Sequence, residues 1–416
     1  MQVFDFFTKM RYNTGMNIKN VVIVGGGASG MLCALKLAES KQFNVTLLER
    51  GERVGRKLSA TGNGQGNISN VRFGAEHYFT DERAKLEKIL NAFNNTALIS
   101  YFTSLGGLFE SDDKGRIYPA SRQASAVTDL LRFALERTGV KVITDCTAHK
   151  IWVKNEKFII VSEKEETFSA DVAVLACGGK AAKNFGTDGS GYGLASALGH
   201  SVTPLYPALV QLKTDTKYIK NLKGIRADCL MCAYDGEKEI AHARGDVIFT
   251  DYGVSGNAAF QLSSYLTDAK RPHISVEFLP NESEEKLSEL LQNKLRFCTE
   301  DGVFGCILNN QIGRAVVKRV RDETGGFSPK DGAHAVKNFN LSVVGTLGFD
   351  YAQVTRGGIP MSEINANLES KKQKNLYLCG EILNVDGECG GYNLQWAFSS
   401  GAAVAESIIN REKERV

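Results

Sequence analysis

Three glycines and one acid near the start of the chain have the types and the spacing of a dinucleotide-binding site. Gly25, Gly27 and Gly30 form a G-x-G-x-x-G pattern, and Glu49 follows about 20 residues further on. In such a site the glycines allow a tight turn, a close approach of the backbone to a pyrophosphate, and tight packing of a helix on a strand. A carboxylate at Glu49 can accept hydrogen bonds from both ribose hydroxyls and would repel a 2′-phosphate. The spacing therefore predicts a site for the adenosine half of FAD or NAD, and not of NADP.

The residues around these glycines predict the elements that would hold the site in place. Four β-formers, Val21 to Val24, precede the glycines, a helical pattern begins near Ser29, and a second apolar run ends at Glu49. A helix that begins there directs its free N–H groups and the positive end of its dipole at an anion. We therefore expect a strand, a turn, a helix and a second strand, as in an α/β dinucleotide-binding domain.

Three further loops contain residue types that suit a long dinucleotide. The segment 55–70 combines cations, glycines and amides directly after the ribose-binding strand. The apolar run 175–179 ends in two glycines, where the ligand of a parallel sheet binds. Gly390 and Gly391 precede a helical pattern, and a helix N-terminus there would stabilise the negative charge of a reduced isoalloxazine ring. NAD has no use for this second helix terminus, so the four loops together favour FAD.

Composition and charge limit the classes of protein to which the chain can belong. Its 416 residues are 43% hydrophobic and 23% charged, with a net charge of +3, as in a globular protein of two or three domains. The small charge and the lack of a basic stripe argue against a nucleic-acid partner, and no apolar run reaches the roughly 20 residues of a membrane span. Nine scattered cysteines, with Cys229 and Cys232 as the only C-x-x-C pair, favour a cytoplasmic location and give no metal motif.

The pattern of elements changes at about residue 199. Before it, strands and helices alternate, and after it come short β-like runs, a helical stretch and a return to strands. The last segment is again a strand, a glycine loop and a helix, so the dinucleotide-binding domain should be discontinuous. We predict a mobile leader over 1–15, the dinucleotide-binding domain over 16–198 and 349–416, a β-barrel insert over 199–258 and 334–348, and a helical insert over 259–333.

Two long glycine-rich motifs resemble those of a known family. GRKLSATGNGQGNISN and GEILNVDGECGGYNLQWAFSSG are similar to the motifs of the BaiN-like flavoproteins, also described as the aminoacetone-oxidase family, and the resemblance runs from Lys19 to Ile409. It implies an α/β fold with a glutathione-reductase-type, Rossmann-like FAD-binding domain that carries a small β-barrel and a small helical subdomain. One departure is that Gln65 and Gly66 stand where the family usually has arginine and cysteine, so the substrate of this chain can differ from those of its relatives.

The resemblance also implies which residues line the cofactor. Carried over by position, these are Gly25, Gly27, Gly30, Glu49, Arg56, Lys57, Gly62, Gly64, Asn67, Gly178, Gly179, Glu381, Asp386, Gly391, Tyr392 and Asn393. Their neighbours in the same loops complete the predicted FAD site: Ala28, Ser29, Arg50, Leu58, Asn63, Ala176, Gly380, Gly390, Leu394 and Gln395. No cysteine or histidine stands in a flavin-attachment context, so we expect FAD to bind noncovalently.

Three activities remain open on the sequence. The first is an FAD-dependent oxidoreductase that uses NAD(P)H to reduce an activated C=C bond or a similar small-molecule acceptor, as the resemblance suggests. The others are a flavin amine oxidase that uses O₂ and a flavin-holding protein linked to RNA modification, against which the charge argues. Because the chain has no second G-x-G-x-x-G, NAD(P)H would have to bind transiently over the flavin.

Catalytic residues and the substrate site are less well marked. No histidine, aspartate or glutamate stands out as a general acid, and Tyr392, Cys177 and Cys389 are weak candidates because of their places in the glycine loops. We expect residues 199–348 to cover the substrate, since everything predicted to hold FAD lies outside them. The apolar wall of that cleft is expected among Leu205, Tyr206, Phe249, Tyr252 and Phe349.

Overall fold

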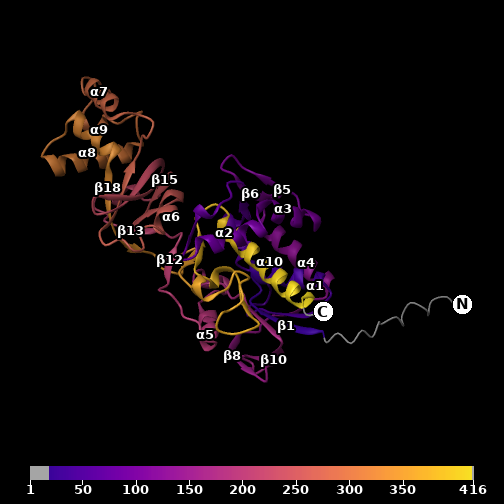
Figure 1. Ribbon diagram of the computed structural model, residues 1–416. Helices are drawn as coiled ribbons and strands as arrows, with labels where there is room; N and C mark the ends of the chain where they lie inside the picture. Colours follow the sequence, from indigo (N-terminus) through magenta and orange to yellow (C-terminus); the bar gives the residue numbers. More distant parts are fainter. Residues whose placement is uncertain (1–17, 415–416) are drawn as a thin grey trace, which may run out of the picture.

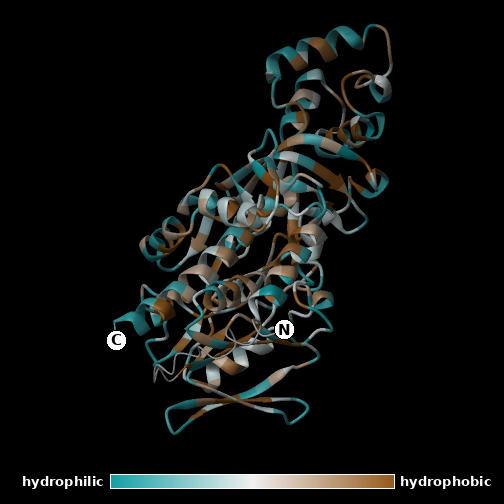
Figure 2. Ribbon diagram, turned by 90° about the vertical axis from the view of Figure 1, so that its right-hand side faces the viewer, coloured by the Kyte–Doolittle hydropathy of each residue, from teal (hydrophilic) through white to brown (hydrophobic). Residues whose placement is uncertain are grey.

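The computed structural model describes residues 18–414, so the leader predicted over 1–15 lies outside the described residues. The chain forms a dinucleotide-binding domain, a barrel beside it and a group of helices at the far end of the barrel (Figure 1). Hydrophobic residues gather in two large cores, one in the dinucleotide-binding domain and one shared by the barrel and the distal helices, and hydrophilic segments lie mainly at the loops and outer surfaces (Figure 2). No helix among residues 18–414 has the length and apolarity needed to cross a membrane.

A five-stranded parallel sheet forms the centre of the dinucleotide-binding domain. Its order is β20-β11-β1-β2-β7, so the strand that precedes the G-x-G-x-x-G turn lies in the middle. Helix α1 packs against α10 and α4 on one side of the sheet, whereas the β8–β10 meander contacts β1 and β11 (Figure 1). These elements are β1 (Lys19–Val24), α1 (Ala28–Glu39), β2 (Phe43–Leu48), α4 (Ala124–Thr138), β7 (Lys141–Ile143), β8 (Ala148–Lys154), β9 (Lys157–Ser162), β10 (Thr167–Ala170), β11 (Val172–Leu175), β20 (Leu376–Leu378) and α10 (Tyr392–Lys413).

The same domain contains smaller elements. They are β3 (Ser69–Asn70), β4 (Tyr78–Thr80), α2 (Arg83–Ala92), α3 (Asn95–Ser104), β5 (Phe109–Ser111), β6 (Arg116–Pro119), α5 (Ser190–Ala197), β12 (Tyr206–Ala208), β19 (Val354–Arg356) and β21 (Val385–Gly387). Strand β21 pairs with β4, and this places the segment before α10 against the segment after the second glycine loop.

Six strands of the insert close into a barrel in the order β13-β16-β15-β14-β17-β18, with α6 packed against it. Cys229 lies in β14 with its side chain buried, and Cys232 is on the opposite, partly exposed face, so the C-x-x-C pair is split as expected for a strand. The elements are β13 (Leu212–Thr214), β14 (Arg226–Asp235), β15 (Lys238–Phe249), β16 (Gly253–Ser255), α6 (Asn257–Ser263), β17 (Pro272–Glu277) and β18 (Phe339–Thr346).

The helical part of the insert is shorter than the sequence predicts. The predicted range of 259–333 is wrong at its start, because β17 lies within it and completes the barrel by pairing with β14 and β18. Ile274 and Val276 of this strand are fully buried in the barrel core, which a short apolar run in the sequence cannot distinguish from part of a helix. The helices that follow are α7 (Glu284–Lys294), α8 (Asn310–Thr324) and α9 (Pro329–Lys337).

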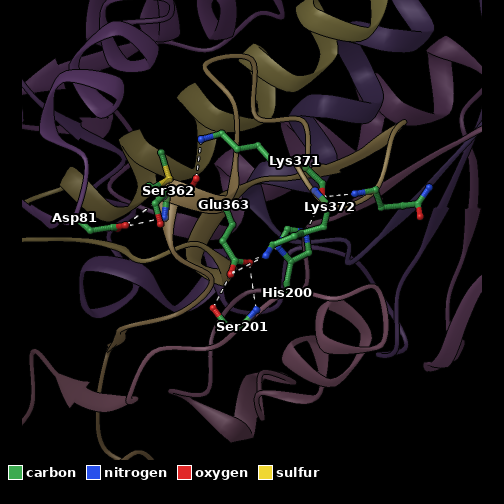
Figure 3. Close-up of polar contacts among 10 residues, drawn as sticks. Asp81, His200, Ser201, Ser362, Glu363, Lys371 and Lys372 are labelled. Carbon is green, nitrogen blue, oxygen red and sulfur yellow. Dashed lines mark hydrogen bonds and ion pairs between the residues drawn. The ribbon is translucent and has the colours of Figure 1, made fainter.

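A polar cluster fixes the place where the chain passes from the dinucleotide-binding domain to the insert. The buried imidazole of His200 lies 2.8 Å from Glu363 through Nδ1 and 2.8 Å from the Ser370 hydroxyl through Nε2 (Figure 3). The Ser201 hydroxyl donates to the other oxygen of Glu363 at 2.7 Å. The residue types resemble those of a serine nucleophile site, but Ser370 is buried and its oxygen accepts from the N–H groups of Lys372 and Gln373. The cluster therefore joins outgoing and returning chain segments and presents no free nucleophile.

Candidate functional site

A cavity of about 840 Å³ extends from the G-x-G-x-x-G turn to the barrel. Most of the predicted cofactor residues line it: Gly25, Gly27, Ala28, Ser29, Glu49, Arg50, Arg56, Lys57, Leu58, Gly62, Asn63, Asn67, Ala176, Gly178, Glu381, Gly390, Gly391, Asn393 and Leu394. They come from all four glycine-containing loops, so the fold brings these loops together around one space. The remaining predicted residues do not line the cavity, and they are considered below.

The three glycines of the first loop have different surroundings. Gly25 has φ of +110°, and a side chain there would collide with the carbonyl oxygen of Ala176. A side chain at Gly30 would collide with the carbonyl oxygen of Gly25, so this glycine allows α1 to pack on the turn and does not face the cavity. Gly27 is the N-cap of α1 and has no heavy atom within 4 Å of the position of a Cβ. The open space at Gly27, in front of the N-terminus of α1, suits a pyrophosphate.

Glu49 holds this loop by both of its carboxylate oxygens. Oε2 accepts a hydrogen bond from the N–H of Gly26 at 2.8 Å, and Oε1 accepts one from the N–H of Gly51 at 2.7 Å. Glu49 also lines the cavity, and a carboxylate oxygen that accepts one hydrogen bond has a further lone pair for a ribose hydroxyl. Glu49 therefore has a structural role in addition to the predicted one.

The cations of the cavity wall are placed by acids and carbonyls. Lys57 Nζ lies 2.7 Å from Glu381, whose other oxygen accepts from the N–H of Thr355 at 2.8 Å. Arg50 lies 2.7 Å from Asp188. Although partial burial opposes ionisation, hydrogen bonds from Arg50 and Ser190 lower the pKa of Asp188 to about 2. These partners thus hold Lys57 and Arg50 in fixed positions in the cavity wall.

The N-terminus of α10 also lies at the cavity. Helix α10 has Gly391 as its N-cap, and Asn393 and Leu394 of its first turn line the cavity. The side chain of Asn393 accepts from the N–H of Gly387 at 2.8 Å and donates to its carbonyl oxygen at 2.6 Å, which fixes the loop before the helix. Because α10 has 22 residues, its free N–H groups and dipole supply a positive end at the cavity.

Seven predicted cofactor residues stay out of the cavity wall: Gly30, Gly64, Gly179, Gly380, Asp386, Tyr392 and Gln395. Gln395 is buried and accepts from the Ser69 hydroxyl at 2.5 Å, and Tyr392 donates to the carbonyl oxygen of Arg72 at 3.0 Å. Asp386 follows Val385 on strand β21, so when Val385 faces the cavity, Asp386 faces away from it. The structure therefore gives these side chains supporting positions around the site.

Asp386 has an unusual environment. Its side chain is 1% exposed, and neither carboxylate oxygen has a hydrogen-bond partner. Burial raises its pKa from 3.8 to about 7, although the charge of Arg356 opposes the rise. Arg356 lies over the ring of Phe79, which is paired with Asp386 across the two strands.

The cysteines in the glycine loops are protonated thiols at neutral pH. Burial raises the pKa of Cys177 to about 12, and burial also raises that of Cys389 despite the nearby Arg116. All nine cysteines are free. Since the thiolate is the reactive form, neither residue is a nucleophile in this environment.

Gln65 and Gly66 differ from the usual residues of the family, and the structure gives a steric reason for the glycine. Gly66 has φ of +77°, and a Cβ there would approach the Cα of Ala124 to 2.9 Å. A cysteine at this position would therefore need a different backbone. Gln65, which stands where relatives have arginine, is exposed and lines the cavity.

The barrel supplies part of the cavity wall, and the sequence does not predict which barrel residues line it. Arg226, Asp246 and Asn257 of the insert line the cavity together with Arg116 and Tyr118 of the dinucleotide-binding domain. None of the five apolar residues expected in this wall lines it: Leu205, Tyr206, Phe249, Tyr252 and Phe349. Phe249 is fully buried in the barrel core, and the wall contains Phe260 instead. No local pattern marks these polar barrel residues, because strand pairing alone brings them to the cavity.

FAD fits the observed cavity. Gly27 leaves room for a phosphate at one helix terminus, Glu49 is within the wall for a ribose, and the α10 terminus suits an electron-rich ring. Among residues 18–414, no group of three or more histidine, cysteine, aspartate or glutamate side chains could hold a metal ion.

Known proteins are similar to this chain in sequence. The chain is 35% identical over 410 residues to 3-dehydro-bile acid delta(4,6)-reductase of Clostridium scindens, covering 95% of this chain and 100% of the relative. It is 26% identical over 412 residues to the ribosomal RNA dihydrouridine synthase of Haemophilus influenzae, covering 93% and 98%. With the parallel sheet and the two helix termini at one cavity, these findings define the class as flavin-dependent oxidoreductases.

Residues 19–407 match the model of the HI0933-like protein Rossmann domain, and the chain belongs to this family. The fold class and the BaiN-like resemblance predicted from the sequence are thus confirmed. Among solved structures, the chain is similar to 3-ketosteroid delta1-dehydrogenase from Sterolibacterium denitrificans, with 11% identity, a TM-score of 0.49 and coverage of 94% of this chain and 100% of that chain. It is also similar to 3-ketosteroid-delta4-(5alpha)-dehydrogenase from Rhodococcus jostii RHA1, with 13% identity, a TM-score of 0.46 and coverage of 93% and 97%.

Proposed function

We propose that this protein binds FAD noncovalently and reduces a C=C bond conjugated to a carbonyl in a small-molecule acceptor, with NAD(P)H as a transient electron donor. The observation that carries the proposal is that one cavity is lined both by the dinucleotide loops and by barrel residues such as Arg226 and Asp246. The relative that acts as a 3-dehydro-bile acid reductase gives the acceptor class, a steroid-like enone. Free cysteines throughout agree with a cytoplasmic location.

The residues of the chain have distinct tasks in this proposal. Gly27 and the N-terminus of α1 would bind the pyrophosphate, Glu49 would accept hydrogen bonds from the ribose, and the α10 terminus would stabilise the electron-rich ring. When bound, FAD supplies the two-electron chemistry. The barrel residues at the far end orient the acceptor and exclude water, because a cleft between domains buries a small ligand on most sides.

A direct test uses the purified holoprotein under anaerobic conditions. NADH or NADPH is added, the loss of flavin absorbance is followed, and the reduced protein is then mixed with a 3-oxo-Δ4 steroid. We expect reoxidation of the flavin with formation of the saturated ketone. If no enone reoxidises the reduced flavin, and if an amine reduces the flavin and O₂ then reoxidises it rapidly, the protein is instead a flavin amine oxidase.

A second candidate function is reduction of a uracil ring in RNA. Two relatives carry the name ribosomal RNA dihydrouridine synthase, the one given above and that of Escherichia coli, which is 26% identical over 404 residues. The net charge of +3 gives little attraction to an RNA backbone, so the small-molecule acceptor is favoured. Incubation of the reduced protein with unmodified ribosomal RNA, followed by mass analysis of nucleosides, separates the two candidates.

A further inference from the structure

Glu388 occupies a special place in the cavity wall. It lies in the short loop between β21 and α10, lines the cavity, and its side chain is 30% exposed. Its backbone N–H donates to the carbonyl oxygen of His77 at 2.9 Å, so the main chain at this position is fixed. The main chain therefore holds Glu388 at one place in the cavity wall.

Both carboxylate oxygens of Glu388 have partners outside the cavity. Oε2 lies 2.9 Å from His77 Nδ1, and Oε1 accepts from the Tyr265 hydroxyl at 2.8 Å. His77 precedes β4 of the dinucleotide-binding domain, whereas Tyr265 follows α6 of the insert. Glu388 is therefore held from both domains at the place where the two meet.

His77 connects this carboxylate to solvent. Its side chain is 23% exposed, its ring stacks on Tyr392 with centroids 4.3 Å apart, and Nε2 lies 3.8 Å from the exposed Glu76. The stacking fixes the imidazole with Nδ1 toward Glu388 and Nε2 toward the outside. An imidazole so placed can take up a proton from water on one side and release one to a carboxylate on the other.

Tyr265 remains a hydrogen-bond donor throughout. Burial and the hydrogen bond to Glu388 raise its pKa to about 12, and its ring packs edge-on against Phe79. Further charged groups near this network are Arg356 beside Tyr265, Arg72 and Glu76 beside Tyr392, and Arg116, Asp246 and Lys114 beside Cys389. Tyr265 thus positions the Glu388 carboxylate without competing for its proton.

We propose that Glu388 is the catalytic acid that protonates the acceptor carbon, with His77 as the group that returns the proton and Tyr265 as a positioning residue. This inference rests on the proposed function. After two-electron transfer to the acceptor, one carbon carries an electron pair as an enolate. The O–H bond of Glu388 breaks, a C–H bond forms at that carbon, and the carboxylate then takes a proton from His77 Nδ1, which regains one from water.

The test compares two oxidants of the reduced holoprotein. Ferricyanide takes electrons without protonation of carbon, whereas the enone needs a proton. In Glu388→Gln, which keeps the size of the side chain, enone reduction should fall by about 10²- to 10⁴-fold. Ferricyanide reduction, the dissociation constant for FAD and the change in flavin absorbance on enone binding to the oxidised protein should stay at wild-type values. In His77→Gln the enone rate should fall less and should be restored by added imidazole.

The matched control is Glu239→Gln, because Glu239 and His242 form a similar pair 3.0 Å apart on the exposed surface of the barrel. It should leave both oxidant reactions unchanged. An enone rate in E388Q close to that of the wild type would overturn the inference, and so would an equal fall with both oxidants accompanied by loss of FAD, which indicates a structural role. A wild-type protein that reduces no enone refutes the proposed function as well, so the two failures are distinguishable.

Discussion

Replacement of Asp386 by asparagine should make the stability of the protein less dependent on pH. The folded protein binds a proton at Asp386 with a pKa of about 7, whereas the ordinary value is 3.8. Because the folded pKa is raised, the folded state binds more protons between these two values, and the wild type loses stability as pH rises through this range. At about 1.4 kcal/mol for each unit of pKa difference, the full loss is about 4 kcal/mol.

Asparagine does not titrate, so the pH dependence contributed by Asp386 is the change with pH in the difference in unfolding free energy between D386N and the wild type. The stability of D386N relative to the wild type should increase by about 3 kcal/mol between about pH 5 and pH 8. The absolute cost of burying the amide is the same at both pH values and does not affect this difference. Denaturant midpoints of the holoprotein, followed by flavin fluorescence with FAD in excess, measure it.

The control for this experiment is Asp268→Asn, which removes an exposed carboxylate 4.0 Å from the same Arg356. That variant should show no comparable dependence on pH. A difference between D386N and the wild type that does not change with pH would refute the reasoning. A fall in FAD affinity in D386N would indicate that Asp386 helps to bind the cofactor, in contrast to its orientation on β21.

Three further predictions concern the cofactor loop and the domain joint. Gly27→Ala should weaken FAD binding but leave the unfolding of the apoprotein almost unchanged. Gly30→Ala should lower the stability of the fold itself by roughly 1–3 kcal/mol. Denaturation of each variant with and without FAD tests both expectations. Glu49→Ala should lower stability as well as FAD retention, because it removes two hydrogen bonds to a charged acceptor, each worth about 1.5–3 kcal/mol, and retained apoprotein stability would contradict this. Partial burial of Glu363 favours its neutral form, but hydrogen bonds from Ser201 and His200 lower its pKa below 4.5. Glu363→Gln should therefore be less stable than the wild type at neutral pH, and the difference should shrink as pH falls below 4.5. Equal stability at neutral pH would contradict a stabilising role of the cluster around His200 and Glu363.

The sequence was most informative where function depends on the local backbone. The turn at Gly25 and the helix start at Gly391 follow from spacing within a few residues, so these features could be read directly. Asp386 is predicted to line the cofactor but lies outside the cavity wall, because neighbours on a strand point to opposite faces and the sequence does not show which face is the cavity. Asp246 of the barrel and Glu388 were missed for a different reason, since their roles depend on contacts between segments far apart in the chain.

The insert leaves the dinucleotide-binding domain and returns to it through neighbouring segments, where β12 pairs with β19 and His200 lies 2.8 Å from Glu363. One wall of the cavity is therefore an exchangeable module, with its own hydrophobic core, while the cofactor loops belong to the rest of the chain. Side chains of that module such as Arg226 and Asp246, which line the cavity, can change without altering the G-x-G-x-x-G turn. Relatives with acceptors as different as a bile acid and an RNA are then what this architecture permits, and insert exchange between them is a route to engineered acceptor specificity.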